Sequence, residues 1–129
     1  MTENLILATD AYKLTHHLQY PTNITKLYSY GEARVGGSFD TVSWFGMSMI
    51  LHDYFHSPIT NAMIDEAEQV SKMTFNTSAY FNRQVWEKVR DLGYFPVKIK
   101  ALPEGLEVPA GNALFTIEST ADWFATSLN

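Results

Sequence analysis

The amino-acid sequence predicts an α+β fold, in which a short mixed or antiparallel sheet with a β-hairpin segment at about residues 97–118 packs with three to four helices. Apolar residues recur at helical spacing between residues 59 and 92, whereas apolar and charged residues alternate after Pro96. The chain has 129 residues, of which 46% are hydrophobic, so it can bury a sizeable core. We therefore expect residues 1–129 to form a single α+β domain.

The charge balance disfavours two classes of partner. Nine basic residues face 14 acidic ones, and the basic residues are scattered singly, so we expect neither nucleic acid nor a membrane surface as a partner. No apolar stretch approaches the ~20 residues that span a bilayer, and the first residues lack the basic start of a signal peptide. Cysteine is absent, which excludes disulfides and thiolate metal sites. These features predict a soluble, cytoplasmic protein.

The first 21 residues predict a strand and a helix. Residues 4–8 are typical of a short buried strand, and Thr9 or Asp10 can cap a helix that ends before Pro21. Leu14 and Leu18 share the face expected to point inward. A second face carries polar and aromatic side chains at the same spacing, namely Tyr12, His16 and Tyr20. This second face is the candidate site.

The next two segments predict a strand and a buried helix. Residues 24–35 alternate between a polar or aromatic side and a side of small residues, which predicts a strand that ends at Gly36-Gly37-Ser38. Residues 42–55, VSWFGMSMILHDYF, are apolar around the whole circumference of a helix, so we expect a largely buried one.

Two amphipathic helices and a β segment follow. Ser57-Pro58 can begin a helix whose apolar residues are Ile59, Met63, Ala67, Val70 and Met73. The next helix runs from about Asn82 to Leu92 with Val85, Val89 and Leu92 inward, and Gly93 ends it. After Pro96, alternation and two Pro-Gly turns predict short strands as far as Glu118.

Several of these stretches together resemble one family. LATDAYKLTHHLQYP, KLYSYGEAR, WFGMSMIL and IKALPEGLEVPAGNALFTIES resemble, in the same order, the N-terminal domain of the nicotinamide phosphoribosyltransferases, which are type II phosphoribosyltransferases. The resemblance implies transfer of a phosphoribosyl group from phosphoribosyl pyrophosphate (PRPP) to nicotinamide, by a Mg²⁺-dependent homodimer. Members are several times longer than this chain, and the resemblance places the catalytic histidine and the barrel beyond it. We expect no catalytic residue and no bound cofactor in this chain alone.

The resemblance assigns roles to five residues. Tyr12 would stack on the pyridine ring across the dimer interface, Asp10 would orient the base, and Arg34 would reach toward the pyrophosphate. His16 would support Tyr12 from beneath through a hydrogen bond, and Lys13 would be a surface charge or a distant phosphate contact. The tail TADWFATSLN would begin a further helix, with Trp123 and Phe124 lacking their neighbours.

Each role has a structural alternative. Tyr12 can be a packing residue, Asp10 a helix cap, and Arg34 one half of an ion pair with Glu32 or another acid on a strand face. The pair His16 and His17 does not predict a metal site, because adjacent side chains on a helix diverge by about 100°. Glu104 and Glu118 would have to lie close together to act as an acid–base pair.

The chain as a whole has an alternative too. It can be a stand-alone binding or regulatory module that has the same fold but no catalysis. An excised domain would expose an apolar patch where its missing neighbour packs, whereas an evolved module should not.

Overall fold

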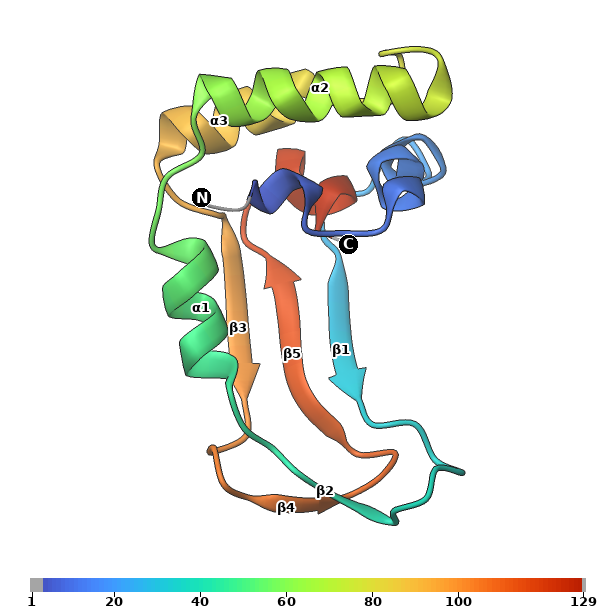
Figure 1. Ribbon diagram of the computed structural model, residues 1–129, viewed down its shortest axis with the longest axis vertical. Helices are drawn as coiled ribbons and strands as arrows, with labels where there is room; N and C mark the ends of the chain where they lie inside the picture. The colour runs from blue at the N-terminus through green and yellow to red at the C-terminus, as the bar shows by residue number, and fades with distance from the viewer. Residues whose placement is uncertain (1–3, 129) are drawn as a thin grey trace.

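The computed structural model describes residues 4–128 and confirms the α+β class. Strands β1 (Tyr28–Glu32), β3 (Val97–Ala101) and β5 (Ala113–Ser119) form an antiparallel sheet in the order β1-β5-β3 (Figure 1). Strands β2 (Thr41–Ser43) and β4 (Glu107–Pro109) form a second, two-stranded antiparallel sheet at one end of the first. The predicted hairpin segment is confirmed, because β3 pairs with β5 and β4 lies between them in sequence.

The helices gather mainly at the other end of the sheet. Helices α2 (Asn61–Phe75) and α3 (Arg83–Leu92) lie side by side across that end, and α1 (Met47–Phe55) runs beside β3 (Figure 1). Three 3-10 helices lie between the α2–α3 layer and the sheet: η1 (Leu5–Leu7), η2 (Ala11–Leu18) and η3 (Asp122–Ser127).

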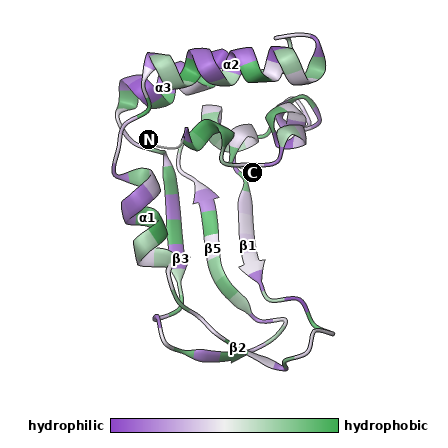
Figure 2. Cartoon of the chain, viewed as in Figure 1, coloured by the Kyte–Doolittle hydropathy of each residue, from purple (hydrophilic) through white to green (hydrophobic). Residues whose placement is uncertain are grey.

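The core lies where these 3-10 segments meet α2 and α3. Ile6 of η1, Ile64 of α2, Val89 of α3 and Phe124 of η3 are all at most 3% exposed and belong to one apolar cluster. Apolar η1 appears green beneath α2 in Figure 2. Phe124, for which the resemblance implies further neighbours beyond this chain, already packs here against Trp86 and Phe95 with ring centroids 6.4 Å apart in each pair.

The predicted strand at residues 4–8 is wrong. Asn4 caps a 3-10 turn instead, because its Oδ1 accepts the N–H of Ile6 at 3.1 Å while its Nδ2 donates to the carbonyl of Met63 at 2.8 Å. These two bonds close the turn and tie it to α2. A three-residue apolar run with such a cap has no need of a sheet partner.

The helix predicted at residues 42–55 is confirmed only over Met47–Phe55, and the prediction that it is largely buried is wrong. Its first residues form β2, which pairs with β4 in the register Val42↔Val108, and Gly46 at φ 98° separates β2 from α1. Helix α1 packs only along one side, where Phe55 contacts Phe95 at 4.9 Å. Met49 and Ile50 are therefore left 61% and 47% exposed.

Three smaller predictions differ in detail. Strand β1 covers only Tyr28–Glu32 of the predicted residues 24–35, although its alternation of exposed and half-buried residues is confirmed. Helix α2 begins after Thr60, whose hydroxyl accepts the N–H of Met63 at 3.3 Å, and not at Ser57-Pro58. Its buried face is Ile64, Ala67 and Ser71, so Val70 and Met73 face outward.

Both predicted ends of α3 are confirmed, whereas two residues that were predicted to face inward are exposed. Asn82 caps α3 through a bond from the N–H of Val85, and Gly93 ends it at φ 80°. Val85 and Val89 are buried as predicted, but Leu92 is 39% exposed. Leu18, which was expected inward, is 56% exposed, because a 3-10 helix turns by about 120° per residue and the predicted face assumed an α-helix.

Candidate functional site

The segment that carries four of the five candidate residues is η2. Asp10 occupies its N-cap position with extended backbone angles, and its carbonyl accepts the N–H of Lys13 at 2.9 Å. The Asp10 carboxylate accepts no capping hydrogen bond and is exposed. The backbone of Asp10 thus starts the helix, and its side chain is left open to a ligand.

Tyr12 presents its ring on the surface of η2. The side chain is 56% exposed, and the His16 ring lies against it with centroids 5.3 Å apart and planes at 54°. The Thr15 hydroxyl donates to the Tyr12 carbonyl at 2.7 Å, which helps to hold the turn. His16 thus contacts Tyr12 through its ring. The exposed part of the Tyr12 ring is available for stacking on a ligand.

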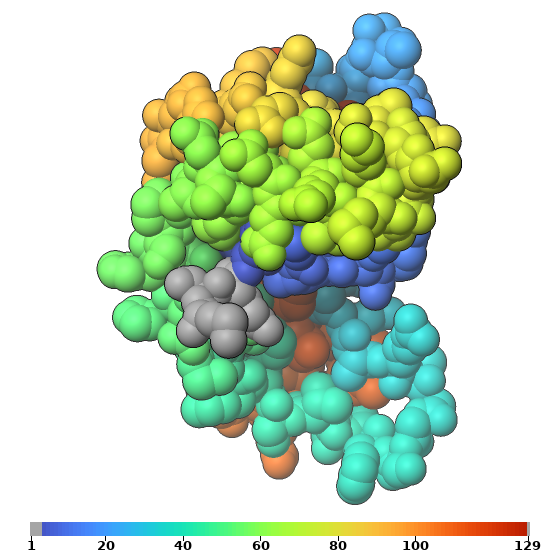
Figure 3. Space-filling view, turned by 45° about the horizontal axis from the view of Figure 1, so that its top comes forward, coloured from blue at the N-terminus to red at the C-terminus, as the bar shows by residue number. Residues whose placement is uncertain are grey.

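Arg34 follows β1 and lies two residues beyond its last residue, Glu32. The Ala33 carbonyl accepts the N–H of Gly111 at 2.8 Å, which anchors the chain one residue before Arg34. The side chain is exposed and pairs with no carboxylate among residues 4–128, so the ion pair with Glu32 is not formed. The segment that follows, cyan in Figure 3, projects from the body of the molecule.

Within this chain the candidate residues do not converge on one site. Segment η2, which carries Tyr12 and begins after Asp10, lies at the helical end of the sheet, whereas β1 ends two residues before Arg34 at the other end (Figure 1). The extended chain from Tyr28 to Arg34 alone spans about 20 Å at ~3.3 Å per residue. A ligand of single-ring size that contacts Tyr12 therefore does not reach Arg34 of the same chain.

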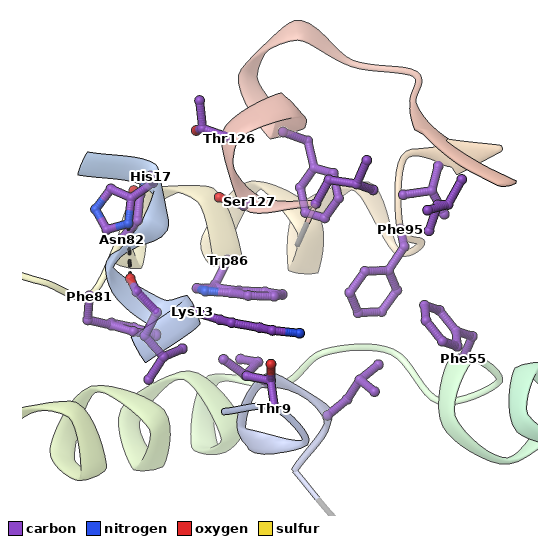
Figure 4. A pocket seen from close by; sticks show the side chains of 17 residues that line it. Thr9, Lys13, His17, Phe55, Phe81, Asn82, Trp86, Phe95, Thr126 and Ser127 are labelled. Carbon is purple, nitrogen blue, oxygen red and sulfur yellow. Dashed lines mark hydrogen bonds between the residues drawn. The ribbon is translucent and has the colours of Figure 1, made fainter. Parts of the chain in front are cut away.

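Behind η2 lies a cavity of about 170 Å³, and Tyr12 is not among the residues that line it. Lys13, Leu14 and His17 of η2 line one wall, and aromatic side chains of other elements line much of the rest (Figure 4). The pKa of His17 is lowered by burial, partly offset by a hydrogen bond between its Nδ1 and the Leu14 carbonyl at 3.0 Å. Near neutral pH the imidazole is therefore uncharged.

The two hairpin acids each have a structural role and do not form an acid–base pair. The Glu104 carboxylate accepts the N–H of Ser48 at 2.7 Å, at the start of α1, and this bond lowers its pKa. Glu118 pairs with Lys26 at 2.9 Å and with Lys98 at 3.6 Å, and the hydrogen bond from Lys26 is the largest cause of its lowered pKa. Both carboxylates thus remain ionised.

Metal ligands do not cluster in the part of the chain that the structure describes. Within residues 4–128 no three side chains of histidine, aspartate or glutamate gather in a way that could hold a metal ion. In the same range no helix is both long and apolar enough to cross a bilayer.

Comparison with known proteins identifies the family. The model of the family described as "Nicotinamide phosphoribosyltransferase, N-terminal domain" matches residues 4–99, which is more than half of the chain. The chain belongs to this family. A nicotinamide phosphoribosyltransferase of Xanthomonas campestris pv. campestris is 40% identical over 92% of this chain, and one of Acinetobacter baylyi is 29% identical over 94%. The chain spans only about a quarter of the length of these two relatives, 25% and 27% respectively.

The family match covers all five candidate residues but not the whole β segment. Asp10, Tyr12 and Arg34 lie within residues 4–99, whereas the Pro-Gly turns of the hairpin lie beyond this range. The alignments with the two nicotinamide phosphoribosyltransferases extend over more than nine-tenths of the chain.

Sequence reasoning missed the aromatic cavity of this nicotinamide phosphoribosyltransferase domain. Its walls come from residues far apart in sequence, including Thr9, Phe55, Trp86, Phe95 and Phe124. No local pattern joins them. The composition carried one signal, since 14% of the residues are aromatic and such a share needs either a core or a binding site to hold it.

Proposed function

We propose that this chain is the N-terminal part of an enzyme that transfers a phosphoribosyl group from PRPP to nicotinamide, giving nicotinamide mononucleotide and pyrophosphate for NAD salvage. The family match and the two relatives named nicotinamide phosphoribosyltransferase support this proposal. The observation that carries it furthest is Tyr12, which sits in the ATDAYK motif and presents an aromatic face to solvent.

Tyr12 would stack on the pyridine ring of nicotinamide. Its exposed ring rests against His16, so the ring has support on one side and remains available on the other. An offset aromatic stack contributes about 0.5–1.5 kcal/mol beyond the burial of its area. The Asp10 carboxylate lies two residues earlier, has no capping bond, and can accept a hydrogen bond from the carboxamide N–H₂.

Arg34 would stabilise the leaving pyrophosphate. A planar guanidinium binds phosphate oxygens through two parallel hydrogen bonds, and Arg34 has no carboxylate partner among the described residues to compete for it. Charge builds up on the pyrophosphate as its bond to C1 of the ribose breaks, so such a contact would strengthen in the transition state.

These residues would act in a homodimer. Tyr12 and Arg34 lie at opposite ends of the sheet, and both face outward. Two copies that exchange these ends would allow a ligand to meet Tyr12 of one copy together with residues of the partner. Tyr12, Asp10 and Arg34 would then complete sites that this chain alone does not contain.

Mg²⁺ and the cytoplasm belong to this proposal as properties of the longer enzyme. Within residues 4–128 no three side chains of the imidazole or carboxylate type gather, and Mg²⁺ is commonly held by one or two carboxylates together with substrate phosphates. The metal would bind where the pyrophosphate is held, together with residues of the longer enzyme. The roles of Tyr12, Asp10 and Arg34 do not depend on it.

A second candidate function is a stand-alone binding or regulatory module with the same fold and no catalysis. One observation speaks for the enzyme part instead. Large apolar side chains are exposed around β2, β4 and α1, and they are Val35, Phe39, Phe45, Met49, Ile50 and Leu106. An apolar surface of this kind suits a domain that packs against further polypeptide.

The test compares the 129-residue chain alone with the same chain joined to the remainder of a longer relative. The 129-residue chain alone should form no nicotinamide mononucleotide from nicotinamide and PRPP. A chimera in which it replaces the matching segment of the Xanthomonas relative should form it. Turnover by the chain alone would contradict the account, and a native species of only 14.6 kDa would favour the stand-alone module.

A further inference from the structure

The cavity behind η2 has the size and the walls for one aromatic ring. Its volume is about 170 Å³, and an apolar cavity of ~150 Å³ is known to hold benzene. Phe55, Trp86, Phe95 and Phe124 line it and contact one another edge to face, with centroids between 4.9 and 6.4 Å apart.

Lys13 adds a positive charge that nothing in the cavity balances. Figure 4 shows its side chain running beside Trp86, with the nitrogen directed toward the space among the rings. No acidic residue is among the described residues that line the cavity, and Lys13 makes no ion pair within residues 4–128. By contrast, Lys26 and Lys98 both pair with Glu118. Lys13 differs from the other cations that are unpaired among the described residues, such as Arg34, in lining an apolar cavity.

Polar groups that can hold an anion lie at the same cavity. The hydroxyls of Thr9, Thr126 and Ser127 line it, and each can donate one hydrogen bond to an oxygen atom. His17 is uncharged there, so Lys13 supplies the only side-chain cation among the described lining residues. One cation matches a single carboxylate.

We propose that this cavity binds a small aromatic carboxylate, with the ring among the aromatic side chains and the carboxylate paired to Lys13. Burial of the ring supplies the apolar contribution, and a charge-assisted hydrogen bond to the ammonium is stronger in these partly dry surroundings than in water. A neutral ring of the same size leaves the ammonium unpaired.

This site is separate from the proposed nicotinamide contact. Tyr12 does not line the cavity, and the ring it would hold belongs to a neutral amide. Lys13 follows Tyr12 directly in sequence, yet Lys13 lines the cavity and Tyr12 does not. A variant of Lys13 therefore tests the cavity, and a variant of Tyr12 tests the transferase role.

The experiment is a titration of the ¹⁵N-labelled chain with benzoate and, in parallel, with benzamide. The two probes share a ring and differ in charge. We expect benzoate to shift the indole N–H signal of Trp86 and the amide signals of Lys13 and Phe124 saturably, while the indole signal of Trp44 stays in place. Benzamide should bind about tenfold more weakly, because it cannot pair with the ammonium.

Two lysine variants complete the test. Lys13→Met should lower the affinity for benzoate to that for benzamide. Lys88→Met is the matched control, since the Lys88 ammonium lies 5.5 Å from the Trp123 ring and does not line the cavity. It should change neither affinity. Equal binding of both probes, the absence of a saturable shift at Trp86, or an unchanged affinity for benzoate in Lys13→Met would overturn the proposal.

Discussion

Replacing Gly31 with alanine should destabilise the fold, because the new methyl group has no room. Gly31 pairs directly with Phe115 across β1 and β5, and a Cβ there would lie 2.2 Å from Cε1 and 2.6 Å from Cζ of the Phe115 ring. The ring cannot move away freely, since it stacks on Trp44 with centroids 5.7 Å apart. Overpacking of this kind costs about 1–3 kcal/mol.

Urea unfolding followed by circular dichroism measures this cost. Gly37→Ala is the matched control, because a Cβ at Gly37 meets no atom within 4 Å and Gly37 has no positive φ. It should stay within about 0.5 kcal/mol of the parent chain. In Gly31→Ala, replacing Phe115 by leucine should recover part of the loss. A free energy of unfolding for Gly31→Ala equal to that of Gly37→Ala would refute the close approach of Gly31 and Phe115.

Three further changes probe other contacts. Glu104→Gln removes a carboxylate whose pKa is lowered below 4.5 by the N–H of Ser48. Such a group stabilises the fold above its unfolded pKa, and this contribution is lost as the pH falls through the lower folded value. The variant should therefore flatten the acid side of the profile of unfolding midpoint against pH, and an unchanged profile would speak against the contact. Phe124→Ala should cost about 3–5 kcal/mol in urea unfolding, because Phe124 is 3% exposed, and a loss below about 1 kcal/mol would be incompatible with its place in the core. Arg83→Met should lower the thermal midpoint, because Arg83 binds three carboxylates within 2.8 Å, and the difference should shrink with added salt; a difference independent of salt would argue against ion pairs.

Local patterns predicted the α+β class and much of the secondary structure. The alternation in β3 and β5, the Asn82 cap and the Gly93 end of α3 depend on neighbours in sequence, so the residues themselves indicate them. The same holds for β1, where small residues mark the side that packs.

The secondary structure that was not predicted depends on contacts between segments that are distant in sequence. Asn4 turns the first apolar run into a 3-10 helix by bonding to Met63, which lies 59 residues away. β2 exists because β4 pairs with it, and α1 begins where Glu104 receives the N–H of Ser48. The spacing of apolar and polar residues within a short segment does not reveal any of these partners.

The candidate site shows the same division. The resemblance selected Tyr12, Asp10 and Arg34 by motif, and the structure adds that Tyr12 is exposed and that Arg34 lies at the other end of the sheet. The cavity that involves Lys13 could not be predicted from spacing, because its walls come from η1, η2, η3, α1, α3 and the sheet.

The central claim is that Tyr12 binds nicotinamide in the longer enzyme. The most direct measurement is the KM for nicotinamide of the chimera with the Xanthomonas relative, compared between the parent, Tyr12→Ala and Tyr12→Phe. Since Tyr12 is 56% exposed, neither change should affect folding. The account predicts a KM about tenfold higher for Tyr12→Ala and nearly unchanged for Tyr12→Phe, which keeps the ring. A KM for Tyr12→Ala equal to that of the parent would contradict it.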